Sequence, residues 1–103
     1  MLKLQPNPTF ILPVDVPVAG ELQPTKIKVT VRYHKPDELT ALLQKDPKMT
    51  IGEFVQTNVV GWDGVEGTFS EDRLRELLSS YHGLDLVIHK AYFNEVYKAA
   101  QGN

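Results

Sequence analysis

The sequence contains no cysteine. This absence excludes a disulfide-stabilised scaffold, a thiol nucleophile and any zinc or iron–sulfur site built on cysteine, and it fits a reducing cytoplasm. Long hydrophobic runs are also missing. Pro13 interrupts the short apolar stretch near the start, so the segment predicts neither a signal peptide nor a membrane span. A net charge of only −2 argues against bulk electrostatic attraction to nucleic acid or to an anionic membrane.

The length of the chain leaves room for one hydrophobic core. Its 103 residues, 42% hydrophobic and 23% charged, have the composition of a small globular domain and are too few for two independent cores. We therefore predict a single domain over residues 1–103, with a hairpin over about residues 8–35 and a helical part over about residues 36–101.

Two stretches near the start alternate between apolar and polar residues. Apolar side chains occupy every second position over residues 10–18 and 27–33, which is the period of a strand with one buried face. Residues 19–25, with a glycine and a proline, are typical of a hairpin loop. Pro13 and Pro17 both remove backbone donors from the same side of the first strand, so we expect that strand at an edge of the sheet.

The remainder of the chain predicts helices separated by turn residues. Thr50 and Ser70 are placed to cap the second and third of these helices, and Gly61 to end the second. The predicted helices cover about residues 36–45, 51–60, 71–81 and 84–100. The predicted fold class is α+β: an N-terminal β-hairpin of two antiparallel strands packed on a bundle of about four short α-helices.

No residues group into a catalytic, cofactor-binding or metal-binding constellation. Asp85 and His89 lie four apart on the last predicted helix, but two ligands do not make a metal site, and no second carboxylate–histidine pair completes it. The serines lack the surroundings of a nucleophile elbow, and the glycine spacing matches no phosphate-binding loop. We therefore predict a protein that is not an enzyme and needs no cofactor.

The last predicted helix is apolar on two sides. One side carries a stripe typical of a core-facing helix, and Leu86, Phe93 and Tyr97 form a second row, seven and then four residues apart. A hairpin and three other short helices offer little to cover that second row, so we predict that it contacts a partner protein. Aromatic residues are the usual anchors of such interfaces.

The two halves of the chain differ in charge. Residues 1–35 carry five basic and two acidic residues, a net charge of +3, whereas residues 36–103 carry six basic and eleven acidic residues, a net charge of −5. Such a polarised surface is suited to self-association into a ring or spiral, with Lys28 and Arg32 of the hairpin contacting the helical part of the next copy. The other interpretation of these cations is an ordinary solvated strand face, where Lys and Arg also discourage edge aggregation. The alternative function is a small nucleic-acid-binding module that uses Lys26, Lys28 and Arg32 as a basic β-ribbon.

The middle of the chain resembles a known protein family. The motif Gly61-Trp62-Asp63-Gly64-Val65, the following Thr68-Phe69-Ser70 and the later Ser80-Tyr81-His82-Gly83 are similar to the small tail assembly chaperones of long-tailed bacteriophages and prophages. The order of the predicted elements agrees over nearly the whole chain. None of these motifs is catalytic. In this setting Trp62 is predicted to be a buried structural anchor between the second and third helices, with its indole N–H hydrogen-bonded.

The resemblance implies a function in virion morphogenesis. A chaperone of this family would cover the aggregation-prone tape measure protein while the tail tube protein polymerises around it. The implied partners are these two proteins and further copies of the chaperone, with no nucleic acid and no membrane. The implied location is the cytoplasm of the bacterial host, and the protein would be absent from the mature virion. The family often includes a longer form made by ribosomal frameshifting.

Overall fold

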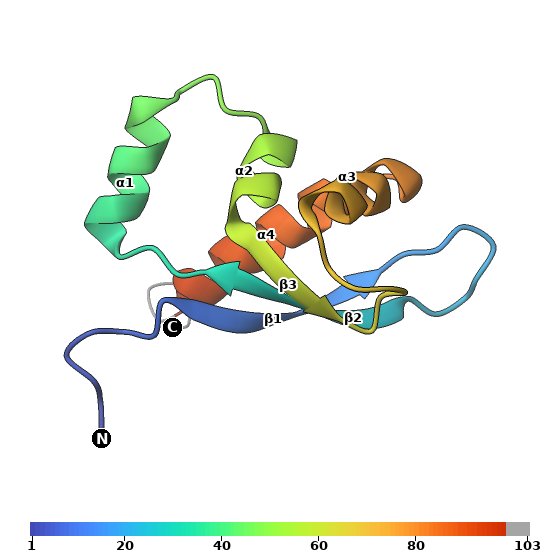
Figure 1. Cartoon of the computed structure of the whole chain (residues 1–103), viewed down its shortest axis with the longest axis horizontal. Helices are drawn as coiled ribbons and strands as arrows, with labels where there is room; N and C mark the ends of the chain where they lie inside the picture. Colours follow the sequence, from blue (N-terminus) through green and yellow to red (C-terminus); the bar gives the residue numbers. More distant parts are fainter. Residues whose placement is uncertain (99–103) are drawn as a thin grey trace.

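The chain forms an antiparallel sheet with helices on one of its sides (Figure 1). The structure is a computed structural model that describes residues 1–98. In chain order its elements are β1 (Thr9–Val16), β2 (Thr25–Arg32), α1 (Pro36–Lys45), α2 (Ile51–Asn58), β3 (Val59–Asp63), α3 (Glu71–Ser80) and α4 (Leu84–Val96). The predicted α+β class, the N-terminal hairpin and the four helices are confirmed.

The sheet has the strand order β1-β2-β3, with both pairs antiparallel. β1 is an edge strand, as its prolines predict, and Leu12, Val29 and Trp62 stand side by side across the three strands. The even-numbered residues of β1 from Leu12 onward are buried, and so are the odd-numbered residues of β2 from Ile27 onward. The alternation seen in the sequence therefore separates a core face from an outer face.

The third strand is the main departure from the sequence-based prediction. We expected the second helix to continue to Val60, but α2 ends at Asn58 and the chain turns directly into β3. The side-chain amide nitrogen of the buried Asn58 donates to the Phe54 carbonyl one turn earlier at 2.8 Å, so this polar group is hydrogen-bonded where the helix ends. Val59 is β-branched and pairs with Val31 on the edge of β2 that β1 leaves open, and Val60 is the extra residue where the register shifts between Thr30 and Val31.

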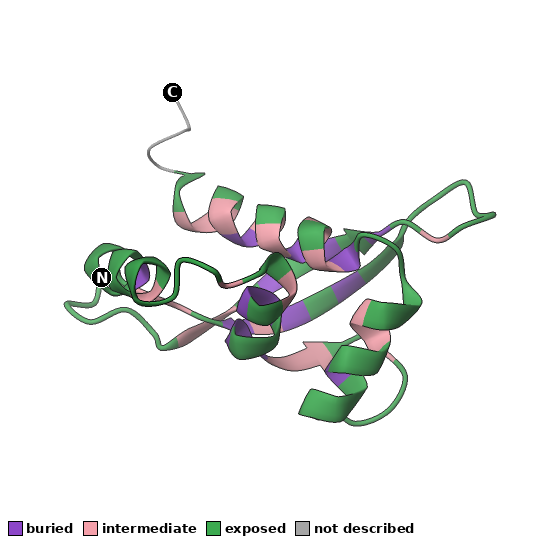
Figure 2. Ribbon diagram, turned by 90° about the horizontal axis from the view of Figure 1, so that it is seen from above, coloured by how far each residue is buried: buried purple, intermediate pink, exposed green. Residues whose placement is uncertain are grey.

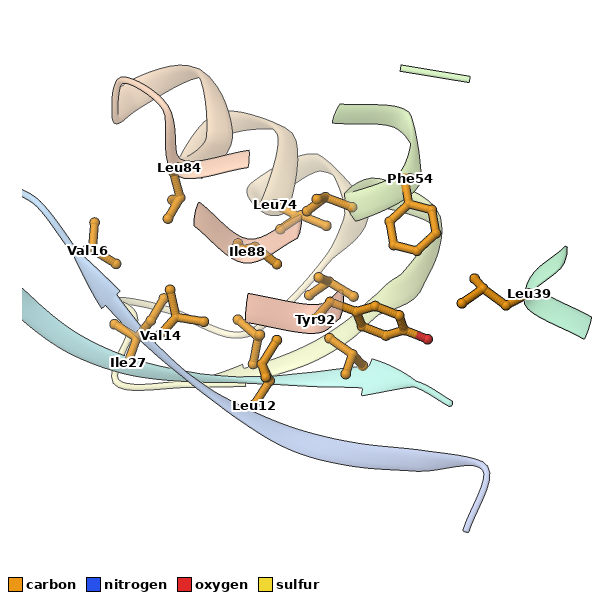
Figure 3. Close-up of a cluster of buried hydrophobic side chains, with 14 residues drawn as sticks. Leu12, Val14, Val16, Ile27, Leu39, Phe54, Leu74, Leu84, Ile88 and Tyr92 are labelled. Carbon is orange, nitrogen blue, oxygen red and sulfur yellow. The ribbon is translucent and has the colours of Figure 1, made fainter. Parts of the chain in front are cut away.

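The core lies between the sheet and the helices (Figures 2 and 3). Tyr92 of α4 is buried at its centre, and its hydroxyl donates to the Arg32 carbonyl at 2.9 Å. Burial raises the pKa of Tyr92 to about 12, which keeps the hydroxyl protonated as a donor. All seven elements contribute buried hydrophobic residues to this core, β3 through its first residue, Val59.

The predicted N-caps at Thr50 and Ser70 are present, but Gly61 does not end the second helix, because it lies in β3 and the C-cap of α2 is Val59. The Thr50 hydroxyl accepts from the Glu53 amide at 3.1 Å, and the Glu53 carboxylate accepts from the Thr50 amide, which closes a capping box. The Ser70 hydroxyl accepts from the Arg73 amide at 3.1 Å. α4 ends at Val96, earlier than predicted, and the last residues of its predicted stripe lie outside the described residues.

Candidate protein-interaction surfaces

The outer side of α4 carries exposed apolar side chains. Leu86 is 54% exposed and Tyr97, at the C-cap, is 38% exposed, whereas Phe93 between them is partly buried. The rings of Phe93 and Tyr97 stack, with centroids 6.1 Å apart and planes 11° from parallel. Figure 2 shows buried positions of α4 on the side toward the sheet and exposed positions along its outer side. We call Leu86, Phe93 and Tyr97 the α4 row.

Aromatic contacts connect the α4 row to the core. The Phe93 ring lies 5.3 Å from the ring of Phe54 on α2 and 5.5 Å from that of Tyr92, measured between centroids. Phe54 in turn meets Tyr92 edge to face at 5.4 Å. Because Phe93 is held by buried rings, the exposed Tyr97 that stacks on it is presented on a rigid base. The sequence indicated the row but not this anchoring.

His89 belongs to the same aromatic group. Its ring lies 4.7 Å from that of Phe93 and 5.4 Å from that of Phe54. Burial lowers the pKa of His89, and the negative charge of Asp85 one turn earlier opposes that shift. Within residues 1–98 no three histidine, aspartate or glutamate side chains gather in a group that could hold a metal ion.

Lys28 and Arg32 lie on the other side of the sheet from the core. Lys28 stands across from Asp63 of β3, and the Arg32 Nε donates to the Thr57 carbonyl at 3.3 Å. Lys26 forms an exposed ion pair with Asp15, with Nζ and Oδ1 3.4 Å apart. Acidic partners therefore interrupt the basic ribbon, which does not favour nucleic-acid binding. The structure does not bring these cations together with the α4 row.

Trp62 lies in β3 and not between two helices as expected. It is partly buried, and its indole Nε1 donates to the Gly67 carbonyl at 3.0 Å, which supplies the hydrogen bond that the sequence predicted. The Phe69 ring packs edge to face against it, with centroids 5.2 Å apart. Trp62 thus holds the loop between β3 and α3 against the sheet.

That loop forms one wall of a cleft that the sequence did not indicate. Gly67 has φ +83°, and a Cβ there would lie 2.7 Å from the Arg73 Nη1, so glycine leaves room for the guanidinium. Arg73 donates from Nη1 to the Thr68 carbonyl at 2.9 Å and fixes the loop to α3. The cleft has a volume of about 550 Å³ and opens between this loop, α3 and the ends of β1 and β2 that adjoin their connecting loop.

The fold and these surfaces define a small α+β protein with exposed apolar side chains along α4 and a cleft beside α3. No helix among the described residues is both long enough and apolar enough to span a bilayer. A family model described as phage tail assembly chaperone matches residues 1–103, and the chain therefore belongs to that family. No curated protein and no solved structure shows significant similarity to it. The motif around Trp62 that carries the resemblance builds the cleft wall.

Proposed function

We propose that the protein is a non-enzymatic chaperone that binds the tape measure protein of its phage and assists assembly of the tail tube. Membership of the tail assembly chaperone family supports this general role. The observation that carries the finer proposal is the α4 row, in which exposed Leu86 and Tyr97 flank a ring anchored in the core. A rigid row of this kind fits the apolar side of a partner helix.

Binding through the α4 row needs no ATP, metal or general base. Apolar contact is released whenever a competing surface buries the same area better, so polymerising tail tube protein can displace the chaperone from the tape measure protein. We place this exchange in the cytoplasm of the bacterial host. A protein displaced in this way is absent from the mature virion.

Self-association is part of the proposal. Lys28 and Arg32 of the hairpin carry exposed positive charge, whereas residues 36–103 carry a net charge of −5, so the basic hairpin of one copy would contact the acidic helical part of the next. Contact between two different surfaces joins copies head to tail, and repetition of that contact produces a ring or a spiral. A chain of copies would offer repeated α4 rows to a long partner, which increases avidity without requiring tight binding at each row.

The test measures aggregation of the tape measure protein encoded in the same phage genome, diluted from denaturant and followed by light scattering. The parent protein should suppress scattering, and Leu86→Asp combined with Tyr97→Ser should need at least about tenfold more protein for the same effect. Leu22→Asp is the matched control, because Leu22 is 100% exposed in the hairpin loop, away from α4. Equal suppression by the parent and the α4 variant, both folded, contradicts the proposal.

A further inference from the structure

The N-terminal segment carries apolar side chains that the rest of residues 1–98 leaves exposed. Leu2 is 97% and Leu4 99% exposed, and the Lys3 Nζ between them donates to the Asn7 Oδ1 of the same segment at 2.7 Å. The segment is tied to the sheet at Pro8, whose carbonyl accepts from the Tyr33 amide at 2.8 Å. We call residues 1–7 the N-terminal arm.

The cleft beside α3 is complementary to the N-terminal arm in polarity and in charge. Its apolar surface comes from Ile27, Trp62 and Leu77, and its exposed acidic side chains are Glu66 and Glu76. The guanidinium of Arg73, which also lines the cleft, is bound to the Thr68 carbonyl of the loop. The volume of about 550 Å³ lies within the range of about 300–1,000 Å³ of pockets that bury a ligand.

The arm and the cleft lie at opposite ends of the sheet. Figure 1 shows the arm leaving β1 at its start, at the other end of that strand from the hairpin loop. The cleft adjoins the end of β1 beside that loop. Along the strand, Val16 lies about 27 Å from Pro8, at roughly 3.4 Å per residue. Fully extended, the chain carries Leu4 at most about 14 Å from Pro8. Leu4 therefore cannot reach Val16, which lines the cleft beside the hairpin loop, within its own molecule.

We propose that the N-terminal arm of one copy docks in the cleft of the next copy. Residues two apart in an extended chain point to the same side, so Leu2 and Leu4 enter the apolar part of the cleft together. Lys3 then points toward the rim, where Glu66 and Glu76 offer opposite charge. The occupant is thus a second copy of this chain, recognised by two leucines and one cation.

This contact joins one end of a molecule to the opposite end of its neighbour, so it is head-to-tail and repeats. It rests on the proposed self-association and specifies how neighbouring copies are held. The α4 row takes no part in it and stays free for the tape measure protein. The loop between β3 and α3 also gains a second role, because the residues that hold it in place shape the cleft that binds the arm.

Cross-linking tests the contact directly, since the chain has no cysteine of its own. Leu4→Cys and Tyr81→Cys proteins, purified separately with tags of different mass, are mixed and oxidised. Tyr81 lines the cleft and is 36% exposed. We expect the mixed disulfide to form at least about tenfold faster than in a mixture of Leu22→Cys with Tyr81→Cys, because docking raises the local concentration of the two thiols. Equal rates in the two mixtures overturn the proposal.

A second experiment separates this inference from the chaperone function. Light scattering coupled to size exclusion, over a concentration series, compares the parent with Leu2→Asp combined with Leu4→Asp. We expect the arm variant to stay monomeric at concentrations where the parent assembles, with an unchanged melting temperature because both leucines are fully exposed. Assembly of the variant at parental concentrations refutes docking of the arm. Suppression of tape measure aggregation by the monomeric variant would show that the α4 row functions independently.

Discussion

Replacement of Trp62 by alanine should destabilise the protein substantially without unfolding it. Removing a fully buried tryptophan costs about 3–5 kcal/mol, and about half of that applies to the partly buried Trp62. Loss of the hydrogen bond from its indole to the Gly67 carbonyl adds about 1 kcal/mol. The expected total is about 2.5–3.5 kcal/mol, which lowers the melting temperature of a domain of this size by about 10–28 °C.

Thermal and urea unfolding followed by far-ultraviolet circular dichroism measure this loss. Trp62→Phe is the matched control, because it keeps an aromatic ring against Phe69 and removes the indole donor. It should lose only about 1 kcal/mol. A Trp62→Ala protein that melts within about 3 °C of the parent would refute the assignment of Trp62 as the residue that holds the loop.

Three further predictions follow from single contacts. Gly67→Ala should lower the free energy of unfolding in urea by about 1 kcal/mol more than Gly20→Ala does. Both glycines have positive φ, but of the two added Cβ atoms only the one at residue 67 would meet Arg73; equal losses contradict this. Because burial lowers the pKa of His89, the folded state favours the neutral imidazole. The part of the folding stability that depends on this shift should be complete above about pH 6.5 and should decrease as pH falls through the lower folded pKa. His89→Gln should remove that part of the pH dependence of stability. Tyr92→Phe should lose about 1–2 kcal/mol, because a buried carbonyl loses its donor; an unchanged urea midpoint is the contrary result.

Much of the fold could be predicted because its signals are local. Alternation over residues 10–18 and 27–33 follows from the two faces of a strand, and the edge position of β1 follows from its prolines. The caps at Thr50 and Ser70 depend only on a side chain and an amide three residues later. Such features need no knowledge of the distant chain.

The third strand and the cleft depend on contacts between distant residues. Val59 and Val60 continue the apolar spacing of α2, so the sequence alone favoured a longer helix. The strand conformation of Val59 follows from its pairing with Val31 of β2, about thirty residues earlier. The cleft likewise joins β1, β2 and α3, and no local motif marks it. The α4 row could be recognised from spacing, but the anchoring of Phe93 against Phe54 could not.

Hydrogen–deuterium exchange of the protein with and without the tape measure protein of its phage tests the central claim most directly. The measurement reports which backbone amides become protected when the two proteins bind. We predict slower exchange over α4 and its C-cap, residues 84–97, where the α4 row lies. Exchange in the hairpin loop around Leu22 should change little. Unchanged exchange throughout α4, with protection confined to other elements or with no binding at all, would contradict it.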